Sequence, residues 1–167
     1  MINLDELISD PAQLRQAFQC FPSGVAAICA TVDGEPAGMA ASTFTAVSIR
    51  PPLVSVCIQD SSSTWPRLRQ CPRLGLSILA EGHDGACLSL SRKNEDRFRG
   101  VEWESCPDGS VFIHDSALWL DCEFYEEVPA GDHAIVLLRI QRLRPNPGVA
   151  PLVYHGSRFR RLDLVAS

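Results

Sequence analysis

The chain has 167 residues, of which 46% are hydrophobic and 21% are charged, and its formal net charge is −5. This length and composition are typical of a globular protein with a sizeable core, so we expect one domain over residues 1–167. The acidic balance disfavours a nucleic-acid partner. No apolar run approaches the roughly 18 residues that a membrane span needs. The acidic start MINLDELISD lacks the features of a signal peptide, and we expect a cytoplasmic protein.

The segment SDPAQLRQAF predicts a helix, with Ser9 or Asp10 as N-cap and Pro11 at the first helical position. Apolar side chains recur within it at helical spacing. The two apolar runs that follow are joined at Asp33-Gly34, which is a strong signal for a two-residue turn. These runs therefore predict a β-hairpin.

Alternating residues predict a strand over 53–58, with Val54, Val56 and Ile58 on its core face. We expect a short helix after DSSST, a strand in RLGLSILA and a helix in HDGACLSL. Later strands are expected in SVFIHD, ALWLDCEFYEEV, HAIVLLRIQRL, PLVYH and RFRRL, and the two long ones could pair across PAGD. This order predicts a mostly β, α+β fold built as an antiparallel barrel with a few short helices.

Scattered cysteines form no Cys-x-x-Cys pair, so their spacing predicts no metal site. In a reducing compartment we expect small buried hydrophobic side chains at these positions. The seven are Cys20, Cys29, Cys57, Cys71, Cys87, Cys106 and Cys122.

Common catalytic motifs are missing from the sequence. It has no Gly-x-Gly-x-x-Gly, no Walker loop and no Gly-x-Ser-x-Gly elbow. Glu126 and Glu127 are adjacent in a predicted strand or turn, so we interpret them as solvated charges on opposite faces. The hydroxyls of DSSST either cap the following helix or cradle a phosphate, and capping is the simpler interpretation. His133 follows a turn and enters an apolar strand, where spacing alone indicates a polar residue at a hairpin exit.

Six segments in the same order resemble the flavin reductase-like family of FMN-binding split barrels, especially its short-chain NAD(P)H:flavin reductases. They cover about residues 14–162, and they are FPSGVAAICATVDGEPAGMAASTFTAVSIRPPLVSVCI, SSTWPRLRQCPRLGLSIL, DRFRGVEW, ALWLDCEF, GDHAIVLLRI and PLVYHGSRFRRL. The resemblance implies a split barrel that binds FMN or FAD and uses NADH or NADPH. It also implies a homodimer, and a separate oxygenase that receives reduced flavin by diffusion.

The resemblance implies a flavin site made from four parts of the chain. One part lines the ring, the next strand runs along it, and two segments lie near the phosphate. The residues matched to this site are Ala41, Ser42, Thr43, Cys57, Ile58, Ser63, Thr64, Ser91, Arg92 and Lys93. Arg50 departs from the pattern, because the family usually has an acidic residue before the double proline. The segment 89–93 is more basic and polar than usual, which leaves FMN and FAD both open.

His133, in the Gly-Asp-His motif, matches a residue associated with nicotinamide binding and hydride transfer, and Tyr154 lies in the block that closes that side of the pocket. Asp132 would orient His133 only if the pair lies in the turn, because adjacent strand residues point to opposite faces. Two alternatives remain on the same barrel: a flavin-binding electron-transfer protein, and a corrin reductase or another reductase.

Overall fold

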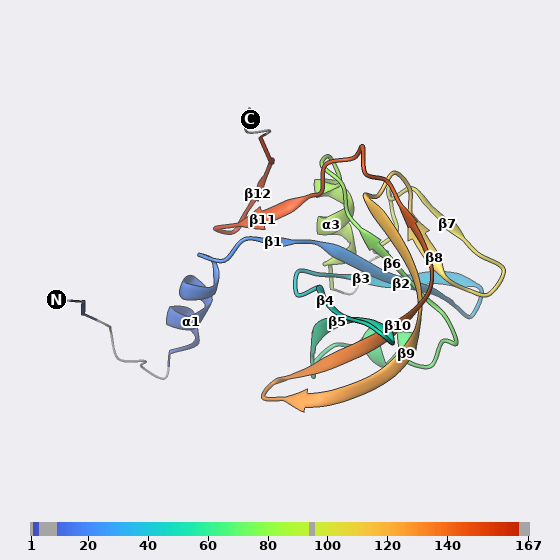
Figure 1. Ribbon diagram of the computed structural model, residues 1–167, viewed down its shortest axis with the longest axis horizontal. Helices are drawn as coiled ribbons and strands as arrows, with labels where there is room; N and C mark the ends of the chain where they lie inside the picture. The colour runs from blue at the N-terminus through green and yellow to red at the C-terminus, as the bar shows by residue number, and fades with distance from the viewer. Residues whose placement is uncertain (1, 4–9, 94–95, 164–167) are drawn as a thin grey trace.

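Antiparallel β-strands are the main regular structure in the computed structural model, which describes residues 2–3, 10–93 and 96–163 (Figure 1). The strands of the main sheet are β2 (Ala26–Val32), β3 (Glu35–Ala41), β4 (Thr45–Ile49), β5 (Pro52–Gln59), β6 (Leu74–Ile78), β9 (Leu118–Ala130) and β10 (His133–Pro145). Their order is β3-β2-β6-β9-β10-β5-β4. The predicted pairing of the two long runs is confirmed, since β9 and β10 are neighbours along their whole length.

Smaller elements surround this sheet. They are the helices α1 (Pro11–Phe18), α2 (Trp65–Leu68) and α3 (Asp84–Leu90), and the strands β1 (Ser23–Gly24), β7 (Trp103–Ser105), β8 (Val111–Ile113), β11 (Val153–His155) and β12 (Arg158–Arg160). We call α1 together with β1, β11 and β12 the arm, because these elements extend away from the main sheet in Figure 1. No helix among the described residues is long and apolar enough to cross a membrane.

The first hairpin forms where the sequence predicts it. Asp33 and Gly34 both have positive φ, 53° and 83°, as a tight two-residue turn requires. Val32 pairs with Glu35 across this turn, so the register of β2 and β3 is set there.

The predicted core face of β5 is also confirmed, because Val54, Val56 and Ile58 are all buried. They pack in one cluster with residues of β2, β6, β9 and β10 and with Trp65 and Leu68 of α2. A second cluster lies between β2, β8 and the end of α3. The core therefore reaches the strands that carry the candidate site.

Cysteines occupy more varied environments than the sequence predicts. Cys29 and Cys122 are buried, and burial raises the pKa of each thiol to about 12. Both behave as small hydrophobic residues, as predicted. Cys20 is exposed just after α1, so the prediction is wrong there. The arm buries little of its own surface, and this is why an apolar neighbourhood in the sequence did not lead to burial.

Helix α1 begins as predicted, with the Asp10 carboxylate accepting the backbone N–H of Ala12 at 2.9 Å. Ser9, the alternative N-cap, lies outside the described residues. No residue of α1 is buried, and Phe18 is 70% exposed. The helix therefore keeps its apolar side chains uncovered within a single chain.

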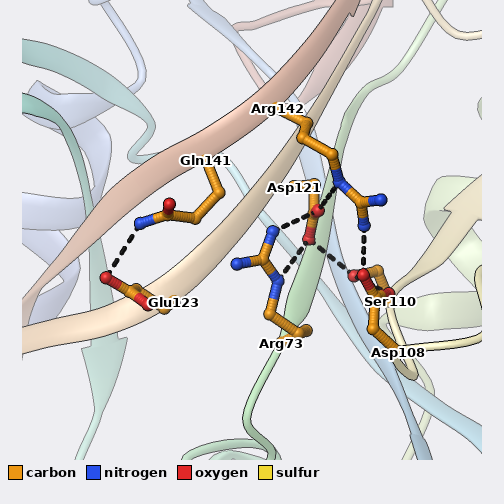
Figure 2. A network of polar contacts seen from close by, with 7 residues as sticks. All are labelled: Arg73, Asp108, Ser110, Asp121, Glu123, Gln141 and Arg142. Carbon is orange, nitrogen blue, oxygen red and sulfur yellow. Dashed lines mark hydrogen bonds and ion pairs between the residues drawn. The ribbon is translucent and has the colours of Figure 1, made fainter.

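An ionic network ties the main sheet to the β7–β8 hairpin (Figure 2). Asp121 of β9 is only 3% exposed and contacts Arg73, before β6, and Arg142 of β10. Ser110 donates to the same carboxylate at 2.7 Å, and Arg142 also pairs with Asp108. Burial alone would raise the pKa of Asp121, but the hydrogen bonds from Arg73, Ser110 and Arg142 outweigh it and lower that pKa.

Candidate functional site

A hollow of about 420 Å³ lies where the ends of β3, β5 and α3 meet the start of β10. We call it the main hollow. Its volume falls in the range of about 300–1,000 Å³ that is usual for small-molecule sites. It is lined by Met39, Ala40, Ala41, Ser42, Thr43, Cys57, Ile58, Gln59, Ser61, Ser62, Ser63, Leu90, Ser91, Lys93, Arg97 and His133.

Nine of the residues matched by the resemblance meet in the main hollow: Ala41, Ser42, Thr43, Cys57, Ile58, Ser63, Ser91, Lys93 and His133. Three others lie nearby but do not line it. Thr64 lines an adjoining hollow, Arg92 stands exposed between Ser91 and Lys93, and Tyr154 lines a hollow of the arm.

The Thr43 hydroxyl joins two walls of the main hollow. It accepts the backbone N–H of Cys57 at 2.8 Å and donates to the Cys57 carbonyl at 3.1 Å. Thr43 lies between β3 and β4, so this side chain supplies hydrogen bonds to β5 where regular strand pairing has ended. The neighbouring Ala41 and Ser42 are small and leave space in front of the backbone. The wall is therefore both fixed and open to a flat polar ligand.

The hydroxyl side chains of the turn before α2 make different contacts. The Ser62 hydroxyl accepts the Trp65 backbone N–H at 3.1 Å, so the predicted capping is confirmed for this serine. Thr64 occupies the N-cap position without a side-chain cap bond, and α2 has only four residues. Ser61 and Ser63 line the main hollow, where their hydroxyls can serve a ligand.

Glu127 holds this turn against β9, which corrects its interpretation as a solvated charge. Its carboxylate accepts the Trp65 indole N–H at 3.2 Å and pairs with Arg69 at 3.3 Å. The Trp65 ring is buried, so its N–H needs such an acceptor. The contact joins residues 62 positions apart, which sequence patterns do not reveal.

His133 is the first residue of β10 and follows the turn Gly131-Asp132. Its Nδ1 lies 2.7 Å from an Asp132 carboxylate oxygen. The hydrogen bond and charge of His133 lower the pKa of the Asp132 carboxyl. Asp132 lies in the turn but His133 already belongs to β10, so the pair is not wholly in the turn, which was the condition expected from the sequence; the two side chains meet nevertheless, because Asp132 precedes the regular strand. Such a bond to one ring nitrogen fixes which face and which nitrogen the imidazole presents elsewhere.

The cationic side of the main hollow includes Arg97, which the sequence reading missed. Its guanidinium donates to the carbonyl of Gly38 at 3.1 Å, so β3 holds it in place. Lys93 lines the same side. Gln59, which pairs with His133 across β5 and β10, was also missed. Gln59 follows the predicted site residue Ile58, and Arg97 lies four residues after Lys93. Proximity to these predicted site residues is the only sequence signal that points to Gln59 and Arg97.

A further hollow of about 450 Å³, the arm hollow, adjoins the main hollow at Ser42 and Thr43. Phe18, Phe21 and Tyr154 contribute aromatic surface to its wall. Among the described residues no group of three or more His, Cys, Asp or Glu side chains could hold a metal ion.

Comparison with known proteins gives consistent matches. A family model described as "Flavin reductase like domain" matches residues 18–163. A "Probable flavin reductase" of Rhizobium meliloti (strain 1021) is 34% identical over 88% of this chain and 47% of its own length, so the chain spans about half of that relative. The "Flavin-dependent monooxygenase, reductase subunit HsaB" of Rhodococcus jostii (strain RHA1) is 28% identical over 92% of this chain and 79% of its own length.

One solved structure matches over nearly the whole chain. The "Streptomyces globisporus C-1027 NADH:FAD oxidoreductase SgcE6 in complex with NAD and FAD fragments" is 31% identical, with a TM-score of 0.89 over 98% of this chain and 100% of that one. The predicted fold class, a mostly β antiparallel split barrel with short helices, is confirmed.

Proposed function

This chain belongs to the flavin reductase-like family, and from this we propose that it transfers a hydride from NADH or NADPH to FMN or FAD. The observation that carries the proposal is the main hollow. It brings a hydroxyl-rich wall of small residues, two cationic side chains and His133 into one space. This donor set suits a flat polar ring that carries a phosphate tail.

The proposed flavin ring lies against Ala41, Ser42, Thr43, Cys57 and Ile58. Small side chains on this wall allow a second ring to approach, and the backbone groups offer hydrogen bonds to a polar ring edge. The phosphate lies at the other side, where Ser63, Ser91 and Lys93 line the hollow and Thr64 and Arg92 stand next to them. The hydroxyls and cations there are ordinary phosphate ligands.

The bound flavin supplies the redox chemistry by accepting the hydride. The protein's own task is to hold the donor in a reactive position. His133 orients the nicotinamide, and Asp132 fixes the imidazole through the 2.7 Å contact. Tyr154 closes the arm side, where the two hollows adjoin.

Exposed apolar side chains support a homodimer. Phe18 and Phe21 are 70% and 77% exposed, and Ile49 on the edge strand β4 is 87% exposed. Exposed apolar side chains that gather on one surface often mark a protein interface, and Phe18 and Phe21 line the same hollow. A second copy covering the arm hollow would also shield Ser42 and Thr43 from water. Light scattering of the purified protein measures its mass in solution and so distinguishes a dimer from a monomer.

The name of the Rhodococcus jostii relative describes a reductase subunit of a flavin-dependent monooxygenase. By this analogy we propose that reduced flavin from this chain diffuses to a separate oxygenase, in the cytoplasm.

One assay tests the central proposal. Purified protein is mixed with NADH or NADPH, with and without added FMN or FAD, and nicotinamide oxidation is followed. Oxidation that depends on added flavin supports the reductase. Tightly bound flavin without such oxidation would instead indicate an electron carrier. His133→Ala should lose most turnover while flavin binding, measured by fluorescence, is kept. Full turnover in that variant would remove His133 from the mechanism.

A further inference from the structure

The adjoining hollow that Thr64 lines has a volume of about 360 Å³ and lies directly beside the main hollow, and we call it the side hollow. The two share Ser63 and Arg97 as lining residues. Beyond them the side hollow runs along the β3 residues Pro36, Ala37 and Gly38. A ligand whose phosphate reaches Ser63 and Arg97 in the main hollow therefore has further space in front of it.

The side hollow carries the groups that a nucleotide tail requires. Arg67 and Arg97 both line it, and a pair of guanidinium groups binds two linked phosphates well. The Asp96 carboxylate accepts the backbone N–H of Phe98 at 3.0 Å, which fixes its position. A carboxylate so held is a usual partner for ribose hydroxyls.

Arg97 is also fixed, by its bond to the Gly38 carbonyl. Arg97 lines both hollows and so stands at their junction, whereas Arg67 lines the side hollow and not the main hollow. FMN ends in one phosphate, which the junction can bind. FAD continues with a second phosphate and an adenosine, for which the side hollow offers space next to the junction.

We propose that the side hollow binds the adenosine diphosphate part of FAD, with Arg67 as the residue that makes the chain favour FAD over FMN. This inference rests on the proposed binding of a flavin phosphate in the main hollow. NADH also contains adenosine diphosphate, but the shared lining at Ser63 and Arg97 continues the flavin side of the site.

The test compares FAD and FMN in the wild type, in Arg67→Ala and in Arg99→Ala. Arg99 is exposed and lines neither hollow, so its replacement is a control that removes the same charge. Dissociation constants are measured by flavin fluorescence, and kcat/KM by nicotinamide oxidation. Arg67→Ala should weaken FAD binding about tenfold and leave FMN binding within about twofold. Arg99→Ala should change neither.

Equal losses for both flavins in Arg67→Ala, or no loss for FAD, would overturn the assignment. A raised KM for NADH with unchanged FAD binding would also overturn it, because the hollow would then serve the nicotinamide nucleotide. FMN binding reports in each variant whether the main hollow is intact. If the wild type binds FAD and FMN but oxidises no nicotinamide, the reductase proposal fails. The comparison of FAD and FMN binding still decides whether the side hollow receives the adenosine diphosphate part of FAD.

Discussion

Replacing Asp121 with Asn should destabilise the protein more than any change of a surface charge. The Asp121 side chain is 4% exposed, and its carboxylate contacts Arg73, Arg142 and the Ser110 hydroxyl (Figure 2). Asn keeps the size of the side chain but removes its charge, and it presents an amide N–H₂ where one oxygen accepted a bond. Two arginines then lose their shared counter-charge.

The expected loss is about 3 kcal/mol of unfolding free energy, at the lower end of what removal of one partner from a buried ion pair costs. The lower end applies because Arg142 is 57% exposed and water can solvate it again, whereas Arg73 is 19% exposed and cannot be solvated as well. For a chain of this size the loss corresponds to a Tm lower by about 6–12 °C.

Thermal or urea unfolding followed by circular dichroism measures this loss. The matched control is Glu123→Gln, on the same strand, where the carboxylate is 40% exposed and pairs with Arg139 and Gln141. That change should cost less than about 1 kcal/mol. If Asp121→Asn unfolds no earlier than Glu123→Gln, the network adds little to stability and the reasoning is refuted.

The same network predicts an acid dependence. Because the folded pKa of Asp121 is lowered, its ionisation stabilises the protein above the carboxyl's ordinary pKa. This contribution is lost as the pH falls below about 4 and through the lowered value. In Asp121→Asn the unfolding free energy should therefore change less between pH 5 and the acid limit than in the wild type. If the unfolding free energy falls equally with pH in both proteins, Asp121 does not cause this acid dependence.

Two further changes test the candidate site. Thr43→Val removes both hydrogen bonds to Cys57, so it should cost about 1–2 kcal/mol of unfolding free energy and weaken flavin binding. Thr43→Ser keeps the hydroxyl and should retain both the stability and the flavin affinity of the wild type. Equal Tm values for Thr43→Val and Thr43→Ser would show that the hydroxyl does not stabilise the protein. Asp132→Asn should lower kcat several-fold while the flavin dissociation constant stays unchanged, because it loosens only the orientation of His133. A selective loss of flavin affinity would argue against this role.

Local patterns predicted the elements whose cause is local. Asp33-Gly34 forms its turn because both residues adopt positive φ, and the core face of β5 follows from simple alternation. Non-local contacts were beyond such patterns. Glu127 meets Trp65 only because α2 packs beside β9, and no neighbouring residue indicates that contact. The uncovered surface of α1 is likewise a property of how the chain is assembled.

Most of the candidate site came from resemblance to a family, since its residues are far apart in the sequence. Spacing alone indicated a hairpin exit at His133 and a helix cap at DSSST, and the structure contains both features. Those local roles do not exclude a binding role, because the same positions also line the main hollow. Arg97 was missed because its importance depends on the Gly38 carbonyl, which lies on a distant strand.

Small residues in and after β3 have two distinct physical causes. At Gly38 the cause is packing, since a Cβ there would lie 2.5 Å from Cys29 Sγ and 3.1 Å from the Phe98 ring. The bare backbone lets the segment that carries Arg97 lie against β3, and so joins the main and side hollows. At Ala41 and Ser42 the neighbouring space is the main hollow itself. Enlarging Gly38 should therefore disturb folding, whereas enlarging Ala41 should chiefly fill the ligand space.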